Sequence, residues 1–165
     1  MKNLKHLIFA LLAVTTLSLS LASCKKDKCK DKTCQNGAPC VDGTCNCTTG
    51  FSGENCEIEN RAKFRSTYNV NETCPSGNFT YQITISNSST GADKVLISNF
   101  GGYGVSVTAT ASGNSLTVAT QQVDVSGNSA TFSGSGQLSG NILTLSYTIS
   151  GGGSSESCTM NCTKV

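Results

Sequence analysis

Cysteine is the residue type that offers the most chemistry in this sequence. The chain of 165 residues contains ten cysteines, and six of them fall between Cys29 and Cys56. Thiols form disulfides, bind metals or act as nucleophiles, and their spacing and neighbours separate these uses. The six-cysteine segment has no Cys-x-x-Cys pair, and the only histidine, His6, lies near the N-terminus. The pattern therefore favours disulfides in an oxidising compartment over a zinc site or a redox pair.

Groups that would support catalysis are scarce elsewhere in the chain. After residue 23 there is no histidine, so neither a Ser-His or Cys-His nucleophile nor a histidine-based metal site can be assembled. Four scattered carboxylates in residues 63–165 are each expected to be solvated at a turn or strand end: Glu72, Asp93, Asp124 and Glu156. The glycine-rich run NFGGYG, residues 99–104, does not match a phosphate-binding loop and is interpreted as a turn, bulge or loop. Tyr103 in this run is a candidate exposed contact for a partner. We expect no enzymatic activity, no cofactor and no metal.

Residues 1–23 have the pattern of an export signal. Lys2 and Lys5 precede an apolar run from Leu7 to Leu21, which is too short for a comfortable membrane span. The residues LASC at 21–24 resemble the lipobox of bacterial lipoprotein signal peptides. That resemblance implies cleavage before Cys24, lipidation of its sulfur and its amino group, and a stable acyl anchor in the cell envelope, at the outer membrane or cell surface. The alternative is an ordinary secretory signal with Cys24 as one more disulfide partner.

A basic segment follows the lipobox. Residues 25–32, KKDKCKDK, contain five lysines and two aspartates, although the net charge of the whole chain is only +2. We interpret residues 24–28 as the lipidated cysteine and a basic tether. Its lysines either attract anionic lipid headgroups or keep a spacer solvated. The segment is short and has no interleaved aromatic residues, so nucleic-acid binding is not expected.

Residues 29–57 carry a second resemblance. They end in the pattern C-x-C-x-x-G-aromatic-x-G-x-x-C, in which Gly50, Phe51 and Gly53 occupy the marked positions. The pattern resembles an EGF-like module, and this implies three disulfides: Cys29 with Cys40, Cys34 with Cys45, and Cys47 with Cys56. A segment this short, with few large apolar side chains, needs such covalent constraints to fold. Gly50 and Gly53 are expected to adopt backbone angles that a β-carbon would penalise. The acidic cluster of calcium-binding relatives is missing, so no calcium site is expected.

After a linker at residues 58–62, the chain reads as strands. Apolar residues alternate with Thr, Ser and Gln in FTYQITIS, VSVTATA and LTLSYTI, which is the period of strands with one buried face. The tripeptide SGN occurs four times, each time just before such a run, and Gly-Asn is typical of hairpin turns. Residues 63–165 are therefore predicted to form an antiparallel meander of eight or nine strands, either a barrel or a sandwich, in an all-β chain. The segment weakly resembles the C-terminal β-rich domains of Bacteroidetes lipoproteins and the lipocalin-like meander.

The alternation also predicts the interior and the remaining disulfide. The expected inward aromatic residues either fill the interior, which we favour, or line a ligand cavity: Phe64, Tyr68, Phe79, Tyr81, Phe132 and Tyr147. Cys158 and Cys162 lie on one face of an extended strand, about 13 Å apart, too far to bridge each other. Either one can meet Cys74 if the first and last strands are neighbours. We choose Cys74 with Cys158, which leaves Cys162 as a free, buried thiol.

Two classes of function are consistent with these features. The first is a lipid-anchored interaction or adhesion protein, whose EGF-like and β-domains recognise a protein or a glycan without catalysis. The second is a carrier of small ligands, if the meander is a barrel with an open mouth. An outer face rich in Thr, Ser and Asn suits shallow, polar recognition, and this favours the first class.

Overall fold

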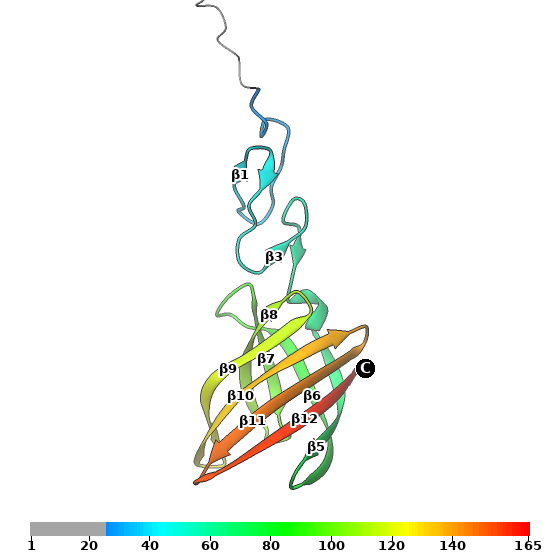
Figure 1. Cartoon of the computed structure of the whole chain (residues 1–165), viewed down its shortest axis with the longest axis vertical. Helices are drawn as coiled ribbons and strands as arrows, with labels where there is room; N and C mark the ends of the chain where they lie inside the picture. The colour runs from blue at the N-terminus through cyan, green and yellow to red at the C-terminus, as the bar shows by residue number, and fades with distance from the viewer. Residues whose placement is uncertain (1–25) are drawn as a thin grey trace, which may run out of the picture.

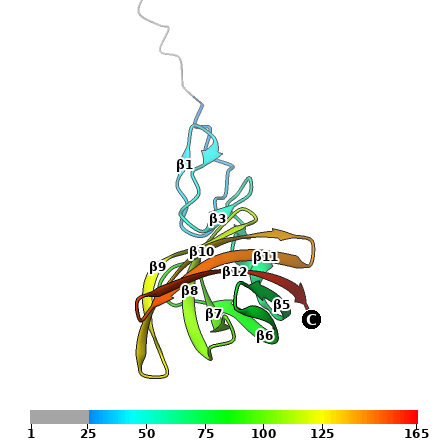
Figure 2. The same cartoon turned by 60° about the horizontal axis from the view of Figure 1, so that its bottom comes forward.

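The computed structural model describes residues 26–165, so the export signal and Cys24 lie outside the described residues. A small disulfide-rich module, residues 26–60, lies against one end of a β-barrel formed by residues 61–165 (Figures 1 and 2). Within this part of the chain, no helix has the length and apolar character needed to cross a membrane. The all-β class predicted from the sequence is confirmed.

The module has two short hairpins in place of a large apolar core. They pair β1 (Cys40–Val41) with β2 (Thr44–Cys45) and β3 (Phe51–Ser52) with β4 (Ile58–Glu59). β4 therefore includes two residues that were expected in the linker. The first turn is Asp42-Gly43, and both residues have positive φ angles, 51° and 87°, as a tight hairpin requires.

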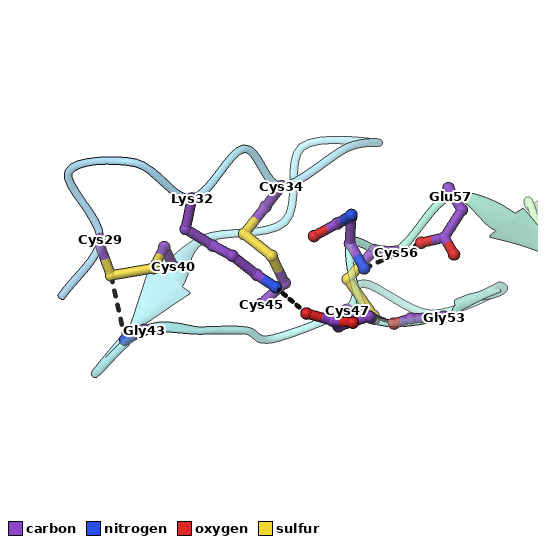
Figure 3. The surroundings of a disulfide bond; sticks show 12 residues. Cys29, Lys32, Cys34, Cys40, Gly43, Cys45, Cys47, Gly53, Cys56 and Glu57 are labelled. Carbon is purple, nitrogen blue, oxygen red and sulfur yellow. Dashed lines mark hydrogen bonds and ion pairs between the residues drawn. A yellow bond between two sulfur atoms is a disulfide. The ribbon is translucent and has the colours of Figure 1, made fainter.

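Three disulfides hold the module together (Figure 3). The structure pairs Cys29 with Cys40, Cys34 with Cys45, and Cys47 with Cys56, which are the pairings that the EGF-like resemblance implies. The small buried cluster of the module consists of Ala38, Cys45 and Cys56. Sulfur thus replaces apolar side chains as the interior of a segment that has few of them.

Eight antiparallel strands close the barrel. They are β5 (Ser66–Cys74), β6 (Gly77–Asn87), β7 (Lys94–Phe100), β8 (Val105–Ser112), β9 (Ser115–Val125), β10 (Asn128–Ser139), β11 (Ile142–Gly151) and β12 (Ser154–Lys164). Each strand pairs with the next along the chain, and β12 pairs with β5, as in Thr159 with Thr73, to complete the ring. Of the barrel and the sandwich left open by the sequence, the barrel is correct.

The two ends of the barrel differ. We call the end next to the module proximal and the opposite end distal (Figure 1). The 3-10 helix η2 (Ala62–Phe64) and the loop 88–93 lie at the proximal end, and the loop 101–104 lies at the distal end. At the proximal end, Phe64 is fully buried and its carbonyl oxygen accepts a 2.8 Å hydrogen bond from the hydroxyl of Tyr68, so that end is plugged.

The interior largely follows the predicted alternation. Phe64, Tyr68, Phe132 and Tyr147 are buried, and Tyr81 is half-buried. Phe79 was also expected inside, but 46% of it is exposed. It lies on the inner face of β6 at the distal rim, where no further strand residues cover it.

The last two strands place the remaining cysteines. Because β12 lies beside β5, Cys74 and Cys158 meet and form a disulfide with their Cα atoms 4.4 Å apart. Cys162, four residues further along the inner face of β12, is a free thiol and is fully buried.

Candidate functional site

The distal half of the barrel wall has an opening between β6 and β7. These strands pair only from Thr84 to Asn87 on β6, so its residues 77–83 have no ladder partner on that side. On its other side β7 pairs with β8, and a bulge at Asn99 interrupts that pairing between Ser98 and Phe100. Asn99 has a φ of 56°, a left-handed conformation that asparagine tolerates better than most residues.

Asn99 also fixes the loop that borders this opening. Its Nδ2 donates a 2.7 Å hydrogen bond to the carbonyl oxygen of Gln82 on β6, and its Oδ1 accepts one of 2.9 Å from the amide of Gly104. The glycines between them allow close contact with aromatic rings. A β-carbon on Gly102 would lie 3.3 Å from the ring of Tyr81, and Gly102 has a positive φ of 73°. The run NFGGYG thus forms a bulge and a loop, as the sequence suggested.

A cavity of about 350 Å³ lies beneath this loop. We call it the mouth cavity, and its lining consists of Glu72, Phe79, Thr80, Tyr81, Gly101, Gly102 and Tyr103. Its volume falls within the range of small-molecule sites in proteins, about 300–1,000 Å³. Tyr103, the aromatic residue singled out from the sequence, is 41% exposed at its rim. The proximal interior is filled by side chains, so the barrel offers a shallow site at its mouth and no deep central cavity.

Glu72 is the unexpected member of this lining. It is only 3% exposed and is the only charged side chain among residues 26–165 that is buried. The expectation that it is solvated is wrong, because Glu72 lies in phase with Tyr68 and Val70 on β5 and therefore points into the barrel. The alternation of inward and outward residues along β5 is the sequence signal from which the burial of Glu72 could have been predicted. Its Oε1 has no hydrogen-bond partner among the described residues.

Two tyrosine hydroxyls near Glu72, those of Tyr81 and Tyr147, are also buried and have no hydrogen-bond partner of good geometry in the described part of the chain. Burial is the main cause that raises the pKa of both tyrosines well above the usual value of 10, and the nearby carboxylate of Glu72 adds to it through its charge and through hydrogen bonding. Both therefore remain neutral at physiological pH. Glu72 and the two hydroxyls thus lie close enough to influence one another, but none of the three atoms has a hydrogen bond of good geometry with the described residues. Of the three residues, only Glu72 and Tyr81 line the cavity.

The other three carboxylates of the barrel have structural roles. Asp93 forms a 2.8 Å ion pair with Lys94, and Asp124 accepts a 2.8 Å hydrogen bond from the amide of Gly127 in the β9–β10 turn. Glu156, at the distal rim, accepts a 2.7 Å hydrogen bond from the amide of Ser76. Each of these three carboxylates thus has a structural contact that explains its position.

The chemistry beside Glu72 does not favour a metal. Its carboxylate lies within 4.8 Å of the sulfurs of Cys74 and Cys158. Those sulfurs are joined in a disulfide and so cannot coordinate a metal as thiolates. One carboxylate alone is a poor cage for a hard cation.

Two further hollows lie on the surface. A groove of about 270 Å³ on the outer wall is bordered by the hydroxyls of β10, β11 and β12, among them Ser133, Ser146 and Thr159. A wider hollow of about 660 Å³ lies at the start of the module, between exposed charged side chains such as Lys26, Lys28 and Asp42. Tyr147 borders the outer groove, but no buried charged side chain of residues 26–165 lines either hollow.

No known family model matches the chain. A solved structure, zebrafish ileal bile acid-binding protein complexed with cholic acid, is 12% identical to it and aligns with 63% of this chain and all of that chain, with a TM-score of 0.34.

Proposed function

We propose that the barrel binds a small ligand at the mouth cavity. The observation that supports this most directly is that Glu72 and Tyr81, which both line the cavity, have buried polar atoms without hydrogen-bond partners of good geometry among the described residues. A buried acceptor or donor left unpaired costs roughly 1–3 kcal/mol, and folded proteins rarely retain such groups without a use. A bound molecule with complementary polar atoms would satisfy them.

From its sequence, the chain is expected to be an interaction module and not a ligand carrier, because the aromatic residues are expected to fill the interior and the outer face is polar. The proximal interior is filled, but the mouth cavity lies next to Glu72 and Tyr81, two of the three side chains of residues 26–165 with a buried polar atom that lacks a partner. We therefore propose the carrier class, with recognition limited to the mouth.

The N-terminal part of the chain complements this function. We propose that Cys24 is lipidated, that residues 29–57 are an EGF-like module, and that the module spaces the barrel from the membrane. The support for the spacing is that the module lies at the proximal end of the barrel (Figure 1), whereas the loop 101–104, which contributes Gly101, Gly102 and Tyr103 to the mouth cavity, lies at the distal end. A ligand then enters from the side that faces away from the lipid.

A tryptophan reporter tests the ligand site. The chain has no tryptophan, so Thr80→Trp places a single fluorophore at the edge of the mouth cavity. Thr84→Trp is the matched control, because Thr84 lies on the same outer face of β6, is also exposed, and does not line the cavity. We expect titration with 2-phenylethanol, a neutral aromatic probe, to change the emission of the Thr80 variant only. Equal responses, or none at a saturating probe concentration, would contradict the proposal.

The outer wall supports a second candidate function, the recognition of a glycan or a protein. Rows of hydroxyls cross β11 and β12, with Ser146 and Thr159 3.2 Å apart and Thr148 and Ser157 3.1 Å apart. Together they form a polar surface beside the outer groove. Binding to a glycan array that is lost in Ser146→Trp and retained in Thr80→Trp would support this function over the mouth site.

A further inference from the structure

The charge on Glu72 has no counterpart inside the barrel. No lysine or arginine of residues 26–165 lies within ion-pair distance of its carboxylate. A buried charge is costly unless a partner of opposite sign or several hydrogen bonds compensate it. The described residues supply no cation, and Oε1 accepts no hydrogen bond of good geometry from them, although the hydroxyls of Tyr81 and Tyr147 lie nearby. A positive charge bound in the mouth cavity would compensate the carboxylate.

The distribution of charge along the barrel also favours a positive partner. Five basic side chains lie at the proximal end: Arg61, Lys63, Arg65, Lys94 and Lys164. Three of them are held there by contacts with the chain. Arg61 binds the carbonyl oxygens of the loop 88–93, Lys94 pairs with Asp93, and Lys164 donates to the carbonyl oxygen of Lys63. No basic side chain of the barrel lies at its distal end.

The distal end has carboxylates instead. Glu72 lies in the mouth cavity, Glu156 lies at the rim, and Asp124 lies beside the β9–β10 turn. The negative charges of Glu156 and Glu72 act on Tyr103 and, after burial, contribute to raising its pKa. A ligand that approaches the mouth therefore meets a negative potential, which attracts cations and repels anions.

The walls of the cavity suit the same kind of ligand. Tyr81 and Tyr103 line it together with Phe79, and aromatic faces attract a cation within about 6 Å of the ring centre. Phe79 and Tyr103 are both partly exposed, so they offer apolar contact to the body of a ligand. The cavity thus combines one desolvated negative charge with aromatic walls.

We propose that the mouth cavity binds a small organic cation, an ammonium group on a compact apolar body, with its charge beside Glu72 and its body against Phe79 and Tyr103. This inference rests on the proposed function, because it assigns a ligand class to that site.

Three probes of matched shape test it on the intact protein. They are 2-phenylethylammonium, neutral 2-phenylethanol and anionic phenylacetate, each titrated while the amide resonances of the mouth residues are followed by NMR. We expect the ammonium to bind at least about tenfold more tightly than the alcohol, and phenylacetate to bind most weakly. Equal affinity of the ammonium and the alcohol at the mouth would overturn the cation inference and leave the proposed function intact. If no probe perturbs mouth resonances, both fail.

Substitution of the counter-ion gives a second test. Glu72→Gln keeps the shape of the side chain and removes its charge, so it should abolish the preference for the ammonium while the alcohol still binds. Asp42→Asn is the matched control, because it removes an exposed carboxylate from the module, and it should leave all three affinities unchanged. A preference for the ammonium that persists in a folded Glu72→Gln protein would overturn the role of Glu72. If that variant does not fold, the comparison of the three probes on the unsubstituted protein still decides the inference.

Discussion

Gly50 of the module lies so close to Ala92 of the barrel that a β-carbon on Gly50 would fall 2.7 Å from the carbonyl carbon of Ala92. The φ angle of Gly50 is +93°, so this glycine is required both for its conformation and for its small size. Arg61 reinforces the contact by donating hydrogen bonds to the carbonyl oxygens of Ser88, Gly91 and Lys94 while it pairs with Glu59. The module is therefore docked on the barrel through specific contacts.

Gly50→Ala should separate the two parts. The substitution adds a collision with Ala92 to a backbone cost of about 1–2 kcal/mol for the left-handed conformation. We expect the barrel to remain folded while the module reorients independently, which ¹⁵N relaxation would detect as two different correlation times. Gly37→Ala is the control, because Gly37 also has a positive φ, +73°, but open space around its α-carbon. One shared correlation time in the Gly50 variant would show that the docking does not depend on this contact.

Asn99→Gly should loosen the loop over the mouth cavity. Glycine accepts the left-handed conformation of Asn99 but removes both side-chain hydrogen bonds, to Gln82 and from Gly104. We expect a loss of roughly 1–2 kcal/mol in local stability, seen as faster hydrogen exchange at the Gly104 amide. Amides at the proximal end should exchange as before. An unchanged Gly104 amide would mean that the bulge alone determines the loop.

Alkaline pH should unfold the barrel cooperatively. Burial raises the pKa of Tyr68 to about 12, and the pKa values of Tyr81 and Tyr147 are raised as well. An unfolded tyrosine titrates near 10, so above that pH the unfolded chain releases protons that the folded chain retains. This contribution to stability is complete below pH 10 and is lost as the pH rises toward 12.

Absorbance at 295 nm checks this prediction, since the chain has tyrosine and no tryptophan. We expect little tyrosinate at pH 10 and a sharp rise that coincides with the loss of β-sheet circular dichroism. A gradual titration centred at pH 10 in a folded protein would contradict the burial of these hydroxyls.

The thiol of Cys162 should be inert in the native protein. Burial, with a smaller effect of Glu72, raises its pKa to about 12, and the nucleophilic form of cysteine is the thiolate. Among the cysteines of residues 26–165, iodoacetamide at pH 8 should therefore label none in the folded protein and only Cys162 after denaturation without reductant, in a Cys24→Ser background that removes the other possible thiol. Cys162→Ala should abolish that label. Rapid labelling of the folded protein would show that β12 opens more readily than its packing suggests.

Lipidation of Cys24 is tested by mass, because this residue lies outside the described part of the chain. Intact protein extracted from membranes should carry the mass of acyl chains, and Cys24→Ser should yield an unmodified chain that leaves the membrane fraction. An unlipidated chain with five disulfides would contradict both the lipid anchor and the assignment of Cys162 as the free thiol.

The sequence was sufficient for the features that depend on local periodicity. Alternation along FTYQITIS and LTLSYTI predicted the strands that became β6 and β11, and the positions of Cys74 and Cys158 are compatible once the first and last strands are neighbours. Closure of the barrel was left open because the same alternation also suits a sandwich.

The candidate site was harder to predict because it depends on where pairing stops. Phe79 follows the inward phase of β6, yet it is exposed because the ladder with β7 ends at Thr84. Glu72 could have been recognised from its phase with Tyr68 and Val70, but a carboxylate is usually found in solvent, and that general preference outweighed the pattern. The docking role of Arg61 depends on carbonyl oxygens about thirty residues away and has no local signal.

The separation of charge along the barrel gives the domain an electric dipole moment. Its positive pole lies at the end that holds the module, and its negative pole lies at the mouth. The field of an anionic bilayer falls off within about a Debye length, roughly 10 Å, so it would act on the basic tether and the start of the module but hardly on the barrel beyond them. The dipole of the barrel would instead act on the solutes around it, drawing small cations toward the distal end and small anions toward the proximal one.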